Sequence, residues 1–386
     1  MLTLPFLLKL LSLPYPVVKA VILYYTCGTI YQNTNEEFKH SLKKNILLSV
    51  EYHVSGNWNK NDMKAVCYLP IEKVIKKFKK HPLSLMLNNF GEKFDQYSYW
   101  IHKSEVPNPT VLIYLHGGGY LLNMFESQFV FITALHYALN DKAAKNVSIL
   151  VVDYSITMFN HVYPTQLYEC LTSYNNLVKA GYSKIMLLGD SAGSHMSLSI
   201  ARSISYPEEV KQQFEGTKFK LNFNVSSLPQ PKALLLDAPW VQPCTPPTLP
   251  TRHGVSFYGD LGSLDTKMGE FYLGDNDLKK VNNFMTFTNT NWEDHWAKVD
   301  PINNGNTLMI VGEREIFRDS AEDFYHLINK NNNIEYYTEP GGIHAGMVYV
   351  ESLDFASKKG AKKAIQGDFS KKYGYNIVAN FINKRV

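Results

Sequence analysis

The chain has 386 residues, enough for one large globular domain with additional segments. Apolar residues make up 45% of it and charged residues 19%, a composition typical of a folded protein rather than a disordered one. The formal net charge is only +4, without a lysine or arginine block of the kind that marks a nucleic-acid surface, so no nucleic-acid partner is expected. The four cysteines are widely scattered and lack metal-ligand spacing: Cys27, Cys67, Cys170 and Cys244. At most one or two disulfides could form, and the sequence leaves open whether any does.

Residues 1–31 are mostly apolar. Leu10–Tyr31 is long enough to span a membrane only if Lys19 is tolerated inside it, at a cost of about 2.5–3.5 kcal/mol at mid-membrane and less if the lysine reaches the interface. The segment fits an uncleaved signal anchor, a cleaved signal peptide or a soluble apolar arm that covers the core. No small-x-small cleavage pattern is obvious near its end, which disfavours removal. We therefore expect a membrane anchor or a segment that lies on the membrane, and the flanking lysines do not decide its orientation.

Residues 32–95 are expected to form an N-terminal arm that contributes to a lid. Within this arm, Lys73–Lys80 is basic with interleaved apolar residues, a pattern that favours the solvated face of a helix over a binding site. Tyr97–His102 then predicts a first strand pair that leads into the core. No internal repeat is present.

A buried strand is predicted over Thr110–Leu115, and it runs directly into His116-Gly117-Gly118-Gly119-Tyr120. Three consecutive glycines let the backbone turn its N–H groups toward one point, as donors to an oxyanion require. The alternative is a phosphate-binding glycine loop, which is disfavoured because neither Gly-Lys-Ser/Thr nor Gly-x-Gly-x-x-Gly is present. We predict that Gly117 and Gly118 supply oxyanion donors.

A second motif lies at residues 189–193, where an apolar run leads into Gly189-Asp190-Ser191-Ala192-Gly193 and residues with helical character follow. Strand, Gly-x-Ser-x-Gly and helix in this order predict a nucleophile elbow that exposes the hydroxyl of Ser191. The N–H of Ala192 would be a further oxyanion donor. Alone the motif is weak, because it also fits a helix capped by a serine. His195 is too close in sequence to reach over Ser191, and we interpret it as structural.

Strands and helices alternate through the rest of the chain, as in a doubly wound sheet. The predicted strands are Thr110–Leu115, Val147–Val152, Ile185–Leu188, Lys232–Leu236, Thr307–Val311 and Ile334–Thr338. The predicted helices lie around Phe125–Leu139, Gln166–Lys179, the segment after the elbow, Ser320–Lys330, Ala356–Ile365 and Tyr375–Asn383.

Residues 241–300 interrupt this alternation. The segment is proline-rich at first and then carries aromatic side chains. We expect this insertion and the N-terminal arm to form a lid over Ser191, with apolar walls suited to a large apolar alcohol or acyl group. For each aromatic residue, packing of the lid on the core is an equally good explanation. They are Phe257, Tyr258, Phe271, Tyr272, Trp292 and Trp296.

A carboxylate is predicted just beyond the strand Thr307–Val311, where it could orient a histidine ring. Glu315 is the best placed, and Glu313 and Asp319 are its rivals. The histidine itself is predicted at His344, which follows the strand Ile334–Thr338 in a glycine-rich loop. A base that accepts and returns a proton has a reason to lie in such a loop.

The chain order Ser191, Glu315, His344 is that of the α/β-hydrolase fold. The glycine loop followed by Gly189–Gly193 resembles the hormone-sensitive-lipase-like branch of that fold. The motif spacing, the segment Gly312–Asp319 and the hydrophobic N-terminus most closely resemble the fungal steryl deacetylases. The matching motifs cover the chain from about residue 110 to the C-terminus. Many members carry aspartate where this chain has Glu315, although glutamate is chemically competent to orient imidazole.

The expected fold is therefore an α/β-hydrolase with a mostly parallel, doubly wound sheet and a helical lid. Its units would be an anchor over residues 1–31, the arm over residues 32–95, and a catalytic domain over residues 96–386. We expect a serine esterase in which Ser191 attacks the ester carbonyl, His344 transfers the proton and Glu315 holds the histidine, while N–H groups of Gly117, Gly118 and Ala192 stabilise the oxyanion. No cofactor and no metal is implied.

The resemblance also implies a lipophilic substrate and a location. The substrate would be a sterol acetate, and the protein would sit in the endoplasmic reticulum membrane with its catalytic domain in the lumen. Of two glycosylation sequons, at Asn146 and Asn224, only the second lies in a polar stretch and is a plausible acceptor. The alternatives are a lipase or carboxylesterase of broader acyl specificity, and a non-catalytic receptor on the same fold, which would typically lack the base.

Overall fold

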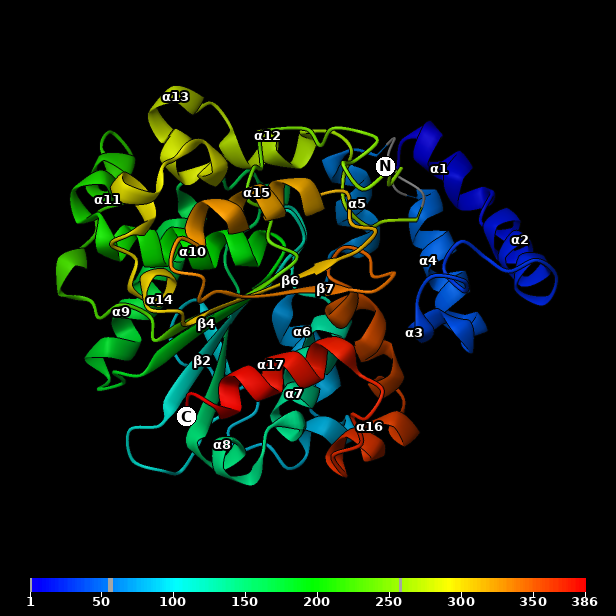
Figure 1. Ribbon diagram of the computed structural model, residues 1–386, viewed down its shortest axis with the longest axis horizontal. Helices are drawn as coiled ribbons and strands as arrows, with labels where there is room; N and C mark the ends of the chain where they lie inside the picture. Colours follow the sequence, from blue (N-terminus) through cyan, green and yellow to red (C-terminus); the bar gives the residue numbers. More distant parts are fainter. Residues whose placement is uncertain (1, 55–57, 257–258) are drawn as a thin grey trace.

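The computed structural model describes residues 2–54, 58–256 and 259–386. Seven strands form a single sheet: β1 (Ser98–His102), β2 (Thr110–Leu115), β3 (Val147–Val152), β4 (Ile185–Asp190), β5 (Ala233–Asp237), β6 (Thr307–Gly312) and β7 (Glu335–Glu339). Their order across the sheet is β1-β3-β2-β4-β5-β6-β7 (Figure 1). β1 is antiparallel to β3, and every other neighbouring pair is parallel. The predicted doubly wound, mostly parallel sheet is confirmed.

Helices cover both faces of the sheet, so successive side chains of a central strand enter two different cores. On β2, Val111 and Ile113 belong to one core, and Leu112 and Tyr114 belong to the other. The first core lies beneath α9 (Thr165–Lys179), α10 (Ala192–Ser205) and α15 (Arg318–Ile328). The second lies beneath α7 (Glu126–Ala138), α16 (Lys358–Ile365) and α17 (Tyr373–Asn383), on the opposite face in Figure 1.

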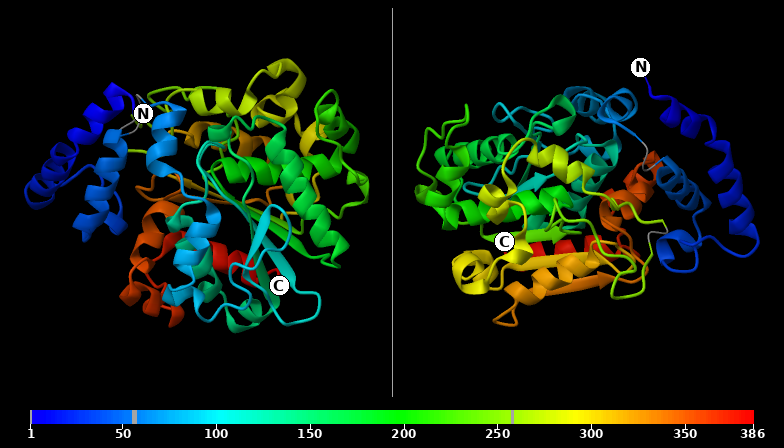
Figure 2. Two further views of the ribbon diagram at one scale, coloured as in Figure 1. Left: turned by 180° about the vertical axis from the view of Figure 1, so that it is seen from behind. Right: turned by 90° about the horizontal axis from the view of Figure 1, so that it is seen from above.

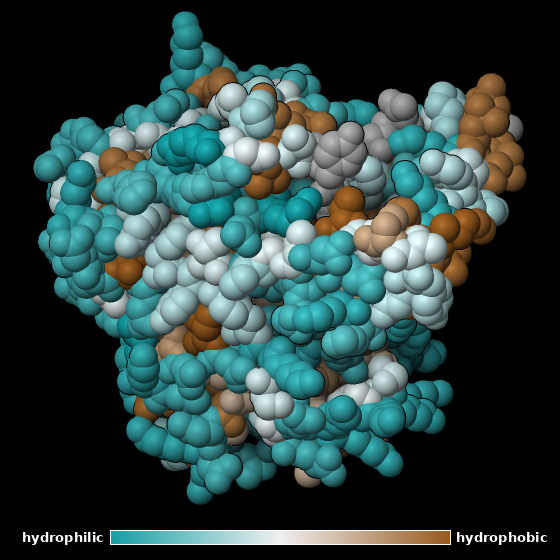
Figure 3. Space-filling model, turned by 45° about the vertical axis from the view of Figure 1, so that its right-hand side comes forward, coloured by the Kyte–Doolittle hydropathy of each residue, from teal (hydrophilic) through white to brown (hydrophobic). Residues whose placement is uncertain are grey.

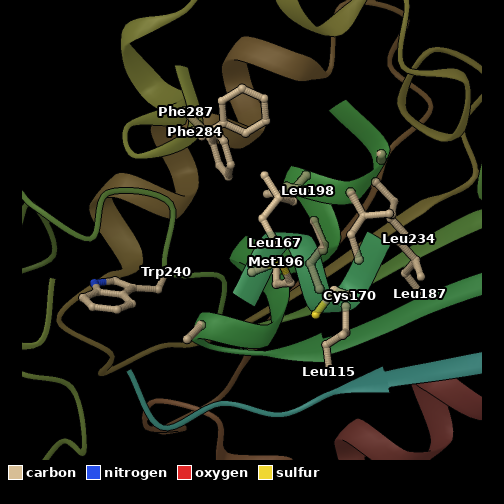
Figure 4. Packing of buried hydrophobic residues seen from close by; sticks show 14 of the residues in the cluster. Leu115, Leu167, Cys170, Leu187, Met196, Leu198, Leu234, Trp240, Phe284 and Phe287 are labelled. Carbon is tan, nitrogen blue, oxygen red and sulfur yellow. The ribbon is translucent and has the colours of Figure 1, made fainter. Parts of the chain in front are cut away.

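Figure 4 shows how the first core joins the strands to the helices above them. Leu115, Leu187 and Leu234 come from the adjacent strands β2, β4 and β5. They pack with Cys170 of α9 and Met196 of α10. All four cysteines of the chain are free thiols in the structure, which answers the question of disulfides that the sequence left open. The rigid packing of α10 on β4 fixes the start of that helix, where Ser191 lies.

The predicted strands and helices agree with the structure to within a few residues, but the first strand pair is only partly present. One regular strand, β1, forms over residues 98–102; it pairs with β3, and the segment before it adds only an isolated bridge from Lys93 to Tyr99. A local pattern of apolar residues does not identify the partner of a strand, because that partner lies about fifty residues further along the chain. The basic stretch Lys73–Lys80 is confirmed as a helix face: α6 (Ile71–Phe78) buries its apolar residues and exposes its lysines.

The N-terminal apolar segment forms α1 (Leu4–Leu11) and α2 (Pro14–Tyr25), which lie at the edge of the molecule beside α4 (Leu42–Val54), as both views in Figure 2 show. Together they make a helical stretch long and apolar enough to cross a membrane, with a mean hydropathy of 1.7. One side packs toward the protein and buries Phe6 and Ala20. Apolar residues on the other side are exposed, and Figure 3 shows hydrophobic residues gathered on this protruding edge.

The remaining helices of the arm are α3 (Glu36–Lys39) and α5 (Lys60–Cys67). An ionic network with buried lysines and a half-exposed Asp354 ties α3 and α4 to the C-terminal part of the chain. The ammonium groups of Lys44 and Lys372 each pair with both Glu37 and Asp354. The arm is therefore fixed to the C-terminal part of the fold at this point, because the lysine side chains are 2% and 8% exposed.

The insertion over residues 241–300 carries α12 (Lys267–Leu273), α13 (Leu278–Val281) and several single turns. α12 lies directly over the glycine loop: Tyr272 stacks on Tyr120 with ring centroids 3.8 Å apart. A Cβ added at Gly119 would lie 2.3 Å from the sulfur of Met268. The arm reaches the same helix, because the Lys267 ammonium donates to the backbone oxygen of Trp58. Two predicted lid aromatics, Phe257 and Tyr258, lie outside the described residues. We call this segment the lid insertion.

The other helices fill the periphery of the fold: α8 (Asp141–Asn146), α11 (Pro207–Phe214) and α14 (Asp300–Asn303).

Candidate active site

Ser191 lies at a tight turn between β4 and α10. Its backbone has φ 53° and ψ −115°, a conformation that L-residues rarely adopt, and its N–H donates to the backbone oxygen of Asp237 at 2.9 Å. The turn brings strand and helix too close for side chains at the flanking glycines. A Cβ at Gly189 would lie 2.2 Å from the carbonyl carbon of Gly193, and a Cβ at Gly193 would lie 1.8 Å from the carbonyl oxygen of Leu115. The glycines of the motif are therefore required by sterics.

The three side chains Ser191, His344 and Glu315 form a continuous hydrogen-bonded chain. The Ser191 hydroxyl donates to Nε2 of His344 at 2.8 Å, and Nδ1–H of His344 donates to Oε1 of Glu315 at 2.6 Å. The second carboxylate oxygen, Oε2, accepts the N–H of Gly312 at 3.0 Å. All three side chains are buried. They come from the carboxyl ends of β4, β6 and β7, where side chains of neighbouring parallel strands meet at one edge of the sheet.

The structure separates Glu315 from its two rivals. Oε2 of Glu313 accepts the N–H of Gly341 at 2.6 Å, and Oδ2 of Asp319 accepts the N–H of Arg252 at 2.8 Å. Of the three acids, Glu315 is the one that contacts the ring of His344.

His195, interpreted as structural, lies in the core on α10. Nδ1 of its ring is 2.7 Å from the hydroxyl of Tyr120, and the ring stacks on Phe287 with centroids 4.7 Å apart. Burial lowers the pKa of His195 to about 3. His195 is therefore a neutral packing residue at physiological pH.

The electrostatic surroundings of His344 suit a base. Burial alone lowers the pKa of a histidine, but the carboxylate of Glu315, with smaller contributions from Asp260 and Asp190, outweighs burial and raises the pKa of His344 above 6.5. A raised pKa means that these carboxylates stabilise the protonated ring relative to the neutral one. The imidazole can accordingly take up the proton of Ser191 and hold it.

The structure corrects one of the three predicted oxyanion donors. The N–H of Gly117 donates to Oδ1 of Asp190 at 2.9 Å, so it points into the protein and not toward an oxyanion. Asp190 also accepts the hydroxyl of Tyr114 at 2.6 Å. In the described part of the chain, the N–H groups of Gly118, Gly119 and Ala192 donate no hydrogen bond. The prediction for Gly117 was wrong because the sequence does not show that Asp190, the residue before Ser191, accepts the N–H of Gly117.

A second residue that sequence analysis missed is Asp260 of the lid insertion. Its buried carboxylate accepts the backbone N–H of His344 at 2.7 Å and that of Ile316 at 2.9 Å. No motif surrounds Asp260, so the sequence carries no signal that would have found it. Asp190 could have been found, because it lies within the serine motif.

One cluster outside the triad has the composition of a metal site. Ligand atoms of His253, Asp319 and Glu322 lie within 4.8 Å of one another. The guanidinium of Arg252 pairs with both acids at 3.6 Å, and His253 Nε2 lies 2.7 Å from Glu322. Because an arginine already balances these carboxylates, we assign no metal role to them.

The family profile of the steryl acetyl hydrolases matches residues 4–210, which is more than half of the chain. The chain belongs to the steryl acetyl hydrolase family. A second profile, that of the alpha/beta hydrolase fold, matches residues 112–348. The chain is accordingly a carboxylic ester hydrolase, a steryl acetyl hydrolase-like esterase on the α/β-hydrolase fold.

Two fungal relatives support this membership. The Schizosaccharomyces pombe protein mug81, named as a candidate steryl acetyl hydrolase, is 28% identical over 373 residues, covering 91% of this chain and 92% of the relative. Steryl acetyl hydrolase 1 of Saccharomyces cerevisiae is 32% identical over 94 residues, 23% of this chain and 21% of the relative.

Solved structures support the fold. A hormone-sensitive lipase from a metagenome library aligns with a TM-score of 0.57 at 16% identity, covering 88% of this chain and 96% of the other. An esterase of the bacterial hormone-sensitive lipase family aligns with a TM-score of 0.54 at 14% identity, covering 89% and 98%. The α/β-hydrolase fold expected from the sequence is thereby confirmed.

Proposed function

We propose that this chain hydrolyses esters through a triad of Ser191, His344 and Glu315. The observation that carries the proposal is the pair of hydrogen bonds that His344 makes, at 2.8 Å to Ser191 and at 2.6 Å to Glu315. As the serine oxygen attacks the ester carbonyl, Nε2 of His344 takes its proton and then gives it to the departing alcohol. A water molecule, activated by the same imidazole, releases the acyl group from Ser191 in the second half of the reaction.

The negative charge on the tetrahedral intermediate would be stabilised by the N–H groups of Gly118, Gly119 and Ala192. Gly119 takes the place of Gly117, whose N–H is bound to Asp190. Left-handed φ values of 109° at Gly118 and 59° at Gly119 support this assignment, because they turn the backbone of the loop sharply beside the serine.

Labelling with a fluorophosphonate probe tests the mechanism first. We expect the intact chain to label and both Ser191→Ala and His344→Ala to lose labelling, because the serine is activated only when the imidazole accepts its proton. Ser194→Ala is a matched control: the hydroxyl of Ser194 is buried and donates to the backbone oxygen of Gly189, so labelling should persist. A folded wild-type chain that never labels would contradict the triad and favour a non-catalytic receptor.

We propose acetylated sterols as substrates. Family membership supports an acetyl ester of a sterol, and the aromatic side chains of Trp240 and Phe317 in the groove beside Ser191 would contact an apolar alcohol. A groove of about 400 Å³ lies beside the site, between the proline-rich start of the lid insertion and the start of α15. Two residues of its wall contact the triad: the backbone N–H of Trp240 donates to the backbone oxygen of Ser191, and the ring centroid of Phe317 lies 5.2 Å from that of His344.

Purified protein would be compared on an acetylated sterol and on a long-chain triacylglycerol. We expect faster hydrolysis of the sterol acetate, and reduced turnover in Phe317→Ala with little change toward p-nitrophenyl acetate, which is too small to need the groove. Rapid hydrolysis of the triacylglycerol beside slow hydrolysis of the sterol acetate would favour a lipase or a broader carboxylesterase.

We further propose that α1 and α2 hold the enzyme on a membrane. The face turned away from α4 carries apolar residues at helical spacing that are 41% to 72% exposed: Leu4, Leu7, Leu8, Leu11, Tyr15, Val18, Ile22 and Tyr25. Sedimentation with phospholipid vesicles tests this step. Leu11→Glu combined with Val18→Glu should abolish co-sedimentation, whereas Leu85→Glu, at an equally exposed apolar residue of the arm, should not.

By resemblance to its family we propose the endoplasmic reticulum as the membrane, with the catalytic domain in the lumen. Asn224 is exposed and would then carry a glycan. Asn146 would not, because the serine of its sequon, Ser148, is buried in β3. Endoglycosidase treatment should shift the wild-type protein and Asn146→Gln but not Asn224→Gln. A membrane-bound chain without a glycan at Asn224 would contradict the lumenal orientation.

A further inference from the structure

Asp260 connects the lid insertion to both loops that carry the catalytic histidine and its acid. One carboxylate oxygen accepts the backbone N–H of His344 at 2.7 Å. The other accepts the backbone N–H of Ile316, the residue after Glu315, at 2.9 Å. Asp260 is 2% exposed, so both hydrogen bonds are protected from water. A single side chain therefore sets the distance between two loops that arise from β6 and β7.

The loop that carries His344 needs such a support. Gly341 and Gly342 precede His344 and Gly346 follows it, and glycine-rich backbone loses more conformational entropy on ordering than any other. Ala345, next to His344, has φ 50°, a strained conformation that persists only where neighbouring contacts impose it. A hydrogen bond to a buried charged acceptor is stronger than one between neutral groups, and here it acts on the backbone of His344 itself.

The carboxylate does not compete with Glu315 for the ring. Glu315 accepts Nδ1–H of His344, while Asp260 accepts the backbone N–H of the same residue. Glu315 thus fixes the direction and tautomer of the ring, and Asp260 fixes the position of the backbone from which the ring extends. An error of about 1 Å in that position would lengthen the bond from Ser191 to Nε2 enough to slow proton transfer.

We propose that Asp260 is a positioning residue through which the lid insertion holds the catalytic base in register with Ser191. The inference rests on the proposed triad. It makes catalytic competence depend on the packing of the lid insertion, because Asp260 belongs to that insertion and its two hydrogen bonds form only where the insertion lies against both loops. Gly259, beside it, packs within contact distance of Tyr31, so the segment that follows α2 lies against the same part of the insertion.

The test compares Asp260→Asn with wild type in the full-length chain, using p-nitrophenyl acetate. Asparagine keeps the size of the side chain but replaces one acceptor by an NH₂ group that faces an N–H. We expect kcat to fall by about 10- to 100-fold and KM to change by less than about threefold, because the positioning of the base is lost and not the binding of substrate. Asp275→Asn is the matched control, since Asp275 is an exposed carboxylate of the same insertion.

A pH profile separates positioning from a merely structural role. The ionisable groups that face His344 are Glu315, Asp260 and Asp190, and those that face Asp260 are His344, Glu315 and Tyr31. Loss of one negative charge near the imidazolium lowers the pKa of His344 and should move the acid limb of kcat/KM to lower pH. Loss of stability alone would leave that limb unchanged at temperatures well below the melting temperature.

A folded Asp260→Asn variant with kcat within twofold of wild type would overturn the proposal. If this variant does not fold, Asp260→Ser supplies the same test, because serine is smaller and neutral and its hydroxyl can satisfy one N–H. Folding is measured by circular dichroism. Failure of the triad is distinguishable: Ser191→Ala that keeps full activity would refute the proposed function, whereas inactive Ser191→Ala beside unaffected Asp260 variants would refute this inference alone.

Discussion

Replacing Glu315 by glutamine tests the triad most sharply, because both carboxylate oxygens of Glu315 act as acceptors. Oε1 accepts Nδ1–H of His344 at 2.6 Å, and Oε2 accepts the N–H of Gly312 at 3.0 Å. An amide has one oxygen and one NH₂ group. In either orientation of Glu315→Gln, the NH₂ group therefore faces a donor, although the size of the side chain is unchanged.

The magnitude follows from the tautomer of His344. If the NH₂ group faces the ring, Nδ1 becomes the acceptor and the ring proton moves to Nε2. Nε2 lies 2.8 Å from the hydroxyl of Ser191 and could then no longer take its proton. If the amide oxygen faces the ring, the tautomer survives but the negative charge that stabilises the imidazolium is lost. We expect kcat to fall by about 10² to 10⁴, equivalent to roughly 3 to 5 kcal/mol of transition-state stabilisation.

The assay is hydrolysis of p-nitrophenyl acetate, with circular dichroism as the measure of folding. Glu313→Gln is the matched control, because Glu313 is exposed, lies two residues earlier and binds the N–H of Gly341 and not the histidine. We expect its kcat to stay within about threefold of wild type. A folded Glu315→Gln variant that keeps more than a tenth of wild-type kcat would refute the reasoning. A larger loss in Glu313→Gln than in Glu315→Gln would show that Glu313, and not Glu315, is the acid that supports His344.

Three further outcomes are expected. Gly193→Ala should destabilise the fold by at least about 3 kcal/mol in thermal unfolding, because its Cβ would lie 1.8 Å from the oxygen of Leu115; a wild-type melting temperature would contradict this. The acid limb of kcat/KM should have its midpoint above pH 6.5, because the pKa of His344 is raised and the ring must be neutral to accept a proton; a midpoint below 6 would contradict the electrostatic argument. Lys44→Met should lower the free energy of unfolding by roughly 2–3 kcal/mol in urea titration, since two acids would share one remaining lysine; an unchanged midpoint would show that the network contributes no stability.

The local parts of this protein could be predicted from the sequence, because their causes are local. Apolar runs bounded by glycine or polar residues placed the parallel strands, and β3 was predicted with its observed bounds. The serine turn was also predictable, since Gly189 and Gly193 are required by contacts within the turn and with the adjacent strand. These features depend on backbone sterics and on burial of neighbouring side chains, which a short stretch of sequence encodes.

Only the tertiary structure shows which residues far apart in the sequence are hydrogen-bonded to each other. The residues hydrogen-bonded to His344 lie 29, 84 and 153 positions away, at Glu315, Asp260 and Ser191. The sequence offered three acids for the histidine, and the register of β6 against β7 selected one. The sequence also could not show that the carboxylate of Asp190 accepts the N–H of Gly117, because that contact forms only when β2 and β4 lie side by side. A hydrogen bond needs a distance and a direction, and packing of the sheet supplies both.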